Sequence, residues 1–173
     1  MQGEAEHHGR NEREHDGPVL VPVDFSPYSA DALTWAARLC ERIGAPLAVL
    51  HVVHDPESAP GYYGQAQGEE HLQRIEEAAA SMMDAFLANV AAEHPDIGLL
   101  KTLAPTLVPG LPVTRILEVA DKLGASMIAM GSQGRTGLPH LMIGSKAQRV
   151  AQLSPIPVTI VKCPGREASH AER

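Results

Sequence analysis

The sequence predicts an α/β fold in which a parallel sheet lies between two layers of helices. Short apolar segments alternate with longer segments of helical periodicity, giving five strands with four helices between them. Apolar residues make up 44% of the chain and are mostly Ala, Val, Leu and Ile, as buried parallel strands require. A chain of 173 residues is long enough for one core and too short for two ordinary domains. We therefore expect a three-layer α/β/α sandwich with a five-stranded parallel sheet.

The charge balance argues against two classes of function. The chain carries 14 Lys+Arg against 21 Asp+Glu, a formal net charge of -7, whereas binding to nucleic acid requires clustered cations. No apolar run approaches the ~20 residues of a membrane span, and the N-terminus is polar rather than a signal peptide. The two cysteines, Cys40 and Cys163, are compatible with a reducing compartment. We expect a cytoplasmic protein that binds neither nucleic acid nor membrane.

Polar tails are expected at both ends of a single domain. The domain covers residues 17–163, between an N-terminal tail of residues 1–16 and a C-terminal tail of residues 164–173. His7, His8 and His15 in the first tail could form a metal-binding segment. Their irregular spacing and the absence of cysteine favour a disordered extension instead.

The first strand and helix have clear boundaries. Residues 19–23 form an apolar strand, and Asp24 stands at its C-terminal end. The pair Ser26-Pro27 predicts a helix start, with Ser26 as the N-cap and Pro27 in the first turn. The apolar positions of this helix, which include Cys40, follow helical spacing, and Gly44 ends it.

The second strand covers residues 47–53 and completes a right-handed parallel crossover unit. Residues 54–68 contain prolines and glycines without periodicity, and we interpret them as a long flap-like loop beyond the strand ends. An acidic start predicts a long helix from residue 69 to about residue 94. Its apolar stripe comprises Ile75, Ala79, Met82, Met83, Phe86 and Val90. Core packing of the two methionines is favoured over a ligand surface.

Strands and helices also alternate in the second half of the chain. Residues 97–108 predict an irregular third strand at a sheet edge, because Pro105 and Pro109 interrupt it. A helix over residues 112–123 and a fourth strand over residues 126–130 follow. The remaining elements are a helix from about Lys146 to about Leu153 and a last strand over residues 158–162.

The segment from Gly131 to Ser145 joins the fourth strand to the last helix and is rich in glycine. Such an arrangement presents free backbone N–H groups to a phosphate. It is not a Walker P-loop, because no GxxxxGK[ST] occurs, and a dinucleotide fingerprint would follow the first strand. A receiver domain would need an acidic pair after the first strand, and an ATP pyrophosphatase would need an SGGxDS-like loop there. Neither pattern is present.

The spacing within this segment resembles the nucleotide-binding pattern of the universal stress protein family. Gly131 is followed by two residues, Gly134, nine residues and then Gly144-Ser145. Val-Pro-Val-Asp-Phe-Ser at the first strand, Leu-His-Val-Val at the second and Ser-Pro-Ile-Pro-Val-Thr-Ile-Val at the last are also similar to that family. The resemblance extends over roughly residues 19–162 and leaves only the tails.

The resemblance implies a strand order 3-2-1-4-5, an adenine nucleotide alpha hydrolase-like fold, and ATP with Mg²⁺ or Mn²⁺ carried on the phosphates. It places adenine beside Val52, the ribose near Asp24 and the phosphates at the start of the last helix. The implied cofactor-binding residues are Pro22, Asp24, Val52, Met130, Gly131, Ser132, Gly134, Arg135, Gly144, Ser145, Lys146 and Ala147. It also implies a homodimer through the last strand, formed by Val158, Thr159, Ile160 and Val161.

Two residues depart from the family pattern. Gln133 stands where the family often has His, and Ser126 stands where an Asp usually precedes the fourth strand. Neither departure alters the glycine spacing, so we expect nucleotide binding to be retained.

Several of the candidate site residues also have a purely structural interpretation. Asp24 could cap the following turn, and Ser145 is a natural N-cap. Arg135 is compatible with a phosphate contact or a solvated loop cation, and Lys146 could be exposed with only its N–H in use. His51 is interpreted as a satisfied core histidine, and His140 has no identifiable partner.

The sequence leaves three functions open. The first is an ATP-binding regulatory protein of the stress response, which is favoured because no base is paired with a nucleophile and no carboxylates cluster for a metal. The second is a slow ATPase or phosphotransferase at the same site. The third is a dimeric interaction module that does not need nucleotide. We expect no catalytic residues and no metal bound by protein side chains alone.

Overall fold

The structure of the protein is a computed structural model that describes residues 17–54, 69–134 and 143–162, apart from the side chains of residues 69–74. The two predicted tails lie outside the described residues, as does the flap-like loop predicted over residues 54–68 except for His54. In chain order the elements are β1 (Val19–Pro22), α1 (Pro27–Ile43), β2 (Leu47–Val53), α2 (Glu69–Glu93), the 3₁₀ turn η1 (Leu99–Lys101), β3 (Thr106–Pro109), α3 (Pro112–Lys122), β4 (Met127–Gly131), α4 (Ser145–Leu153) and β5 (Val158–Val161).

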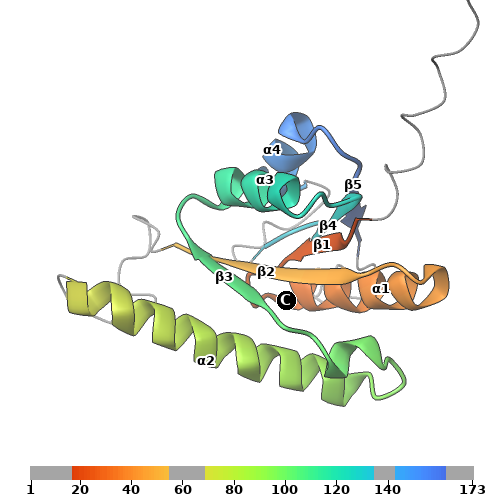
Figure 1. Cartoon of the computed structure of the whole chain (residues 1–173), viewed down its shortest axis with the longest axis horizontal. Helices are drawn as coiled ribbons and strands as arrows, with labels where there is room; N and C mark the ends of the chain where they lie inside the picture. Colours follow the sequence, from red (N-terminus) through yellow and green to blue (C-terminus); the bar gives the residue numbers. More distant parts are fainter. Residues whose placement is uncertain (1–16, 55–68, 135–142, 163–173) are drawn as a thin grey trace, which may run out of the picture.

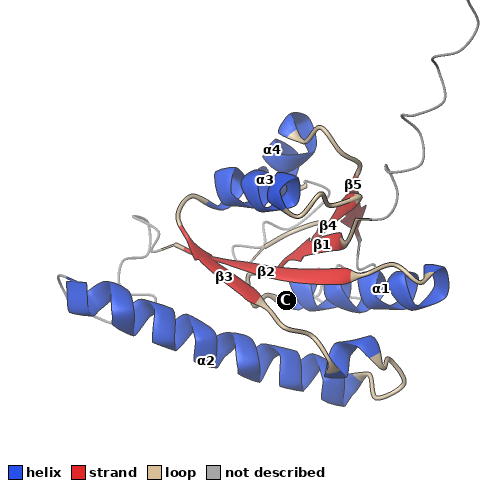
Figure 2. Cartoon of the chain, in the orientation of Figure 1, coloured by secondary structure: helices blue, strands red, loops and turns tan. Residues whose placement is uncertain are grey.

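The strands form one parallel sheet in the order β3-β2-β1-β4-β5, which confirms the predicted topology. Helices α1 and α2 cover one face of the sheet, and α3 and α4 cover the other (Figure 1). Figure 2 shows the strands as a middle layer between the two helical layers. Because the chain reverses its direction of travel across the sheet after β3, β4 pairs with β1.

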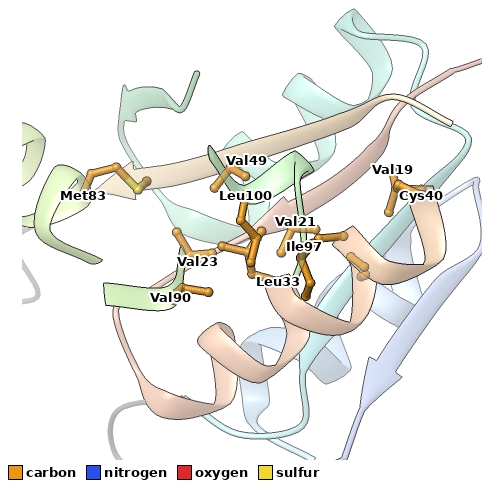
Figure 3. Packing of buried hydrophobic residues seen from close by; sticks show 13 residues of the cluster. Val19, Val21, Val23, Leu33, Cys40, Val49, Met83, Val90, Ile97 and Leu100 are labelled. Atoms are coloured by element: carbon orange, nitrogen blue, oxygen red, sulfur yellow. The ribbon is translucent and has the colours of Figure 1, made fainter. Parts of the chain in front are cut away.

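Two clusters of buried side chains lie on the two faces of the sheet. On the α1–α2 face, Val19, Val21 and Val23 pack against Leu33 and Cys40 of α1 (Figure 3). The neighbouring residues of β1 point to the opposite face, as the period of two in a strand requires. There Leu20, Leu50, Ile128 and Val150 pack with Ile116 and Ala120 of α3.

The ends of α1 follow the sequence signals. Ser26 is the N-cap, and its Oγ accepts a hydrogen bond from the N–H of Ser29 at 3.2 Å. Gly44 ends the helix in the left-handed conformation at φ 70°, which a residue with a Cβ adopts only with strain. Cys40 is fully buried in this helix, and burial raises the pKa of its thiol. Its prediction as a core residue is confirmed.

Helix α2 is the longest of the described helices and buries a single stripe. Ile75, Ala79, Met83 and Val90 are buried, whereas Met82 is half-buried. The structure therefore supports core packing of Met83. Within the described ranges, no helix is both long enough and apolar enough to span a bilayer.

The prediction for the third strand is wrong in its length. The strand covers only Thr106–Pro109, and residues 99–101 form the turn η1 instead. Ile97 and Leu100 are buried against α1 and α2, so a compact turn satisfies the apolar positions that suggested a strand. Its predicted position is confirmed, because β3 is an edge strand.

Replacement of Leu33 tests the larger core cluster. Leu33 is fully buried at the centre of α1, so Leu33→Ala should lower the free energy of unfolding by about 2–5 kcal/mol. Leu153→Ala is the matched control, since Leu153 is 48% exposed and its replacement should change stability by less than about 0.5 kcal/mol. Urea unfolding followed by circular dichroism measures both, and equal effects would contradict this account of the core.

Candidate functional site

A cleft lies beyond the carboxyl ends of β1 and β4. These strands are neighbours, but the helices that follow them cover opposite faces, so their connecting turns diverge and leave a crevice. The cleft has a volume of about 200 Å³. Ten of the twelve predicted site residues line it: Pro22, Asp24, Val52, Met130, Gly131, Gly134, Gly144, Ser145, Lys146 and Ala147.

The turn after β1 holds Asp24 in one orientation. Its Oδ1 accepts hydrogen bonds from the N–H of Ser26 at 3.1 Å and from the Oγ of Ser26. Phe25, between them, has φ 63°, a left-handed conformation that is costly for a bulky residue. Asp24 therefore caps the turn and also lines the cleft, so its structural role does not exclude contact with a ligand.

His51 of β2 lies beside the turn after β1 and lines the cleft. It is buried, and its Nδ1–H donates to the carbonyl oxygen of Val23 at 2.8 Å, a bond that selects one tautomer. Its ring stacks on Phe25 with centroids 4.1 Å apart. These contacts support its interpretation as a satisfied core histidine, although it also contributes to the cleft wall.

Ser132 anchors the start of the glycine-rich loop through its main chain. Its N–H donates to Val161 at the end of β5 at 2.9 Å, and its carbonyl oxygen accepts from the N–H of Gly144 at 2.8 Å. Its side chain is not among the residues that line the cleft. The hydroxyl is buried, with no hydrogen-bond partner among the described residues. The predicted site residue Arg135 and the loop residue His140 lie outside the described residues.

The N-terminus of α4 opens into the cleft. Its N-cap is Gly144 and not Ser145 as predicted, so no side chain caps the helix. The first hydrogen bond of the helix runs from the N–H of Gln148 to the carbonyl of Gly144 at 2.9 Å. The N–H groups of Ser145, Lys146 and Ala147 therefore precede the hydrogen-bond ladder, and all three residues line the cleft. Such a helix end favours an anionic ligand.

The cleft also contains residues that were not predicted as site residues. They come from the turn after β1, the first turn of α1, β2 and its end, α3 and the glycine-rich loop: Val23, Ser29, His51, His54, Pro112, Ile116 and Gln133. Ile116 belongs both to the buried cluster on the α3–α4 face and to the cleft wall. Apolar periodicity identifies such a residue as buried but does not distinguish core from cleft wall.

The described residues include no group of three or more His, Cys, Asp or Glu side chains that could hold a metal ion. Asp24 contributes an acidic side chain to the cleft wall.

Comparison with known proteins agrees with the fold. Residues 17–162 match the universal stress protein family. Universal stress protein YxiE of Bacillus subtilis is 33% identical over 147 residues, which are 83% of this chain and 97% of that protein. A universal stress protein of Thermus aquaticus is 30% identical over 144 residues, again 83% and 97% of the two chains.

The chain belongs to the universal stress protein family. A solved structure of the protein MJ0577 is 26% identical with a TM-score of 0.66 and covers 86% of this chain and 96% of that one. The universal stress protein UspA of Lactobacillus plantarum has the same fold, with a TM-score of 0.63 at 20% identity over 84% of this chain and 97% of that one. Another universal stress protein of this fold was solved in complex with cAMP, with a TM-score of 0.58 at 20% identity over 84% of this chain and 96% of that one.

Replacement of Ser26 tests the turn that orients Asp24. Ser26→Ala removes both the N-cap of α1 and the hydroxyl bonded to Asp24, so it should lower the free energy of unfolding by about 1–2 kcal/mol. Ser81→Ala is the matched control, because Ser81 is exposed within α2 and its replacement should be close to neutral. Chemical unfolding measures both variants. A cost for Ser26→Ala no larger than for Ser81→Ala would contradict the role of the turn.

Proposed function

We propose that this universal stress protein binds ATP in the cleft and acts as a nucleotide-dependent regulator. The observation that carries the proposal is the α4 N-terminus, which has no side-chain cap and contributes Ser145, Lys146 and Ala147, the residues before the first helical hydrogen bond, to the wall of the cleft. A helix end of this kind is stabilised by an anion, and phosphate oxygens can accept from several of these groups at once. The solved complex of a family member with cAMP supports an adenine nucleotide as the ligand.

The cleft offers different surfaces to the two ends of ATP. The apolar wall of Pro22, Ile116 and Met130 suits the adenine ring, and the main chain of Val52 would read its edge. The first turn of α4, with Ser145, Lys146 and Ala147 in the cleft wall, would supply main-chain N–H groups to the phosphates. In this proposal the ribose lies between the two ends, near Asp24, and the triphosphate extends along the loop from Gly131 to Gly144. Mg²⁺ would be held mainly by the phosphates.

The proposed regulator changes state through occupancy of the cleft. ATP would join the turn after β1 to the N-terminus of α4, because residues of both segments line the cleft. A ligand that binds the folded state stabilises it in proportion to the logarithm of its concentration. The protein could therefore respond to the cellular concentration of ATP through binding alone, without hydrolysing it.

Replacement of Ser145 by proline tests the backbone cradle directly. Ser145 is the first residue of α4, where proline is well tolerated, and Gly144 has ψ 142°, which suits a residue before proline. Ser145→Pro should keep the fold and remove one N–H, and should weaken ATP binding by about tenfold or more in calorimetric titration. Ser145→Ala keeps that N–H and should weaken binding by only about two- to threefold.

Two results would contradict the proposal. One is no heat of binding for the wild-type protein at millimolar ATP with Mg²⁺. The other is equal affinity for ATP, ADP and adenosine, because phosphates held by α4 should make affinity rise with their number.

We further propose that the protein forms a homodimer through β5. In the part of the chain that the structure describes, β5 pairs with β4 on one side and its other edge is open. The bonds of β4 reach Pro157 and Val161, so by the period of two the N–H groups of Val158 and Ile160 point to the open edge. An open edge of apolar residues favours pairing with a second copy.

Replacement of Val158 by proline tests the dimer. Val158 is the first residue of β5, a position where proline is tolerated in strands, and the change removes an outward N–H. Val158→Pro should shift the protein from dimer to monomer by sedimentation at micromolar concentration, whereas Val158→Thr should remain dimeric. A wild-type monomer under these conditions would contradict the proposed dimer.

A further inference from the structure

The three glycines of the loop motif do not share one reason for being glycine. None of Gly131, Gly134 and Gly144 has a positive φ, so none is required by the conformation of the main chain. The remaining reason for glycine is a lack of room for a side chain, and the room for a Cβ differs among the three positions.

Gly131 is closed in by α1. A Cβ at this position would lie 2.7 Å from the carbonyl oxygen of Tyr28 and 3.0 Å from its Cβ. Tyr28 is in the first turn of the helix, so its main chain cannot move away without moving the cap at Ser26. Gly131 thus lets the end of β4 contact the start of α1.

Gly134 is closed in by the turn after β1. A Cβ here would lie 2.8 Å from Oδ2 of Asp24. This carboxylate is not free to rotate, because its other oxygen accepts from the N–H and the Oγ of Ser26. Gly134 therefore lets the loop lie against Asp24.

Gly144 has room for a side chain. Among the described residues, the nearest neighbour of a Cβ at this position would be the Cα of Gln133 at 3.6 Å, an ordinary van der Waals distance. Its φ of -55° and ψ of 142° suit any residue, and a serine here would cap α4 better than glycine does. Nothing among the described residues requires glycine at this position.

We propose that Gly131 and Gly134 are positioning residues, kept small by Tyr28 and Asp24, and that only Gly144 is kept small by the ligand. The role of Gly144 rests on the proposed function, whereas the roles of Gly131 and Gly134 do not. The two positioning glycines seat the loop on the first β–α turn before any nucleotide arrives. The space beside Gly144 is the place where an anionic group of a nucleotide passes next to the main chain.

Thermal melting without nucleotide tests the positioning glycines. Gly131→Ala and Gly134→Ala should each lower the melting temperature by about 3–10 °C, as overpacking does in a chain of this size. The effect of Gly134→Ala should fall to about 1 °C or less in an Asp24→Ala background, because the atom that it meets is then gone. Equal effects of Gly134→Ala in the two backgrounds, or unchanged melting of Gly131→Ala, would overturn their assignment.

Two variants test Gly144, and each should keep or raise the melting temperature while weakening ATP binding. Gly144→Ala should melt within about 2 °C of the wild type, and Gly144→Ser should melt at the same or a higher temperature because it caps α4. Both should bind ATP at least tenfold more weakly in calorimetric titration. Wild-type affinity in either variant would overturn the role of Gly144. If the wild-type protein binds no adenine nucleotide, the proposed function and the role of Gly144 both fail, while the melting data still decide for Gly131 and Gly134.

Discussion

The parallel pairing of β1 with β4 is the interaction on which the rest of the structure depends. It joins Val19 to Met127 and Leu20 to Ile128, residues more than a hundred positions apart in the chain. Because α1 and α4 then cover opposite faces, the turns that leave the two strands separate and open the cleft. The contact between Gly134 and Asp24 and the one between Gly131 and Tyr28 exist only because this pairing brings their strands together.

Main-chain groups fix the glycine-rich loop and form the polar end of α4 beside the cleft. Ser132 bonds through its N–H and carbonyl to the end of β5 and to Gly144, and α4 offers N–H groups without help from a side chain. A site built in this way depends on the path of the chain more than on the identity of its side chains. Relatives about one-third identical to this chain can therefore share the fold while differing at most positions.

Much of this arrangement could be predicted from local sequence, and the rest depends on distant contacts. Ser26-Pro27 and Gly44 defined α1 because caps act within one turn. Ile97 and Leu100 suggested a longer strand, since periodicity reports burial and a 3₁₀ turn buries them equally well. The N-cap of α4 was placed one residue late, because serine is the commoner cap and the carbonyl of Ser132 that fixes Gly144 is visible only in the fold. The residues that leave no room for a side chain at Gly131 and Gly134 are Tyr28 and Asp24, which lie about a hundred positions earlier in the chain.

The two edges of the sheet differ in a way that limits how the protein can grow into larger assemblies. β3 is four residues long, is preceded by Pro105 and ends in Pro109, and proline cannot donate to a further strand. β5 carries no proline, so a neighbouring strand can be added there. Two copies that join through β5 about a two-fold axis place a β3 edge at each end of a continuous sheet. In the proposed dimer, addition would then stop, and the product would be a closed pair rather than a fibre.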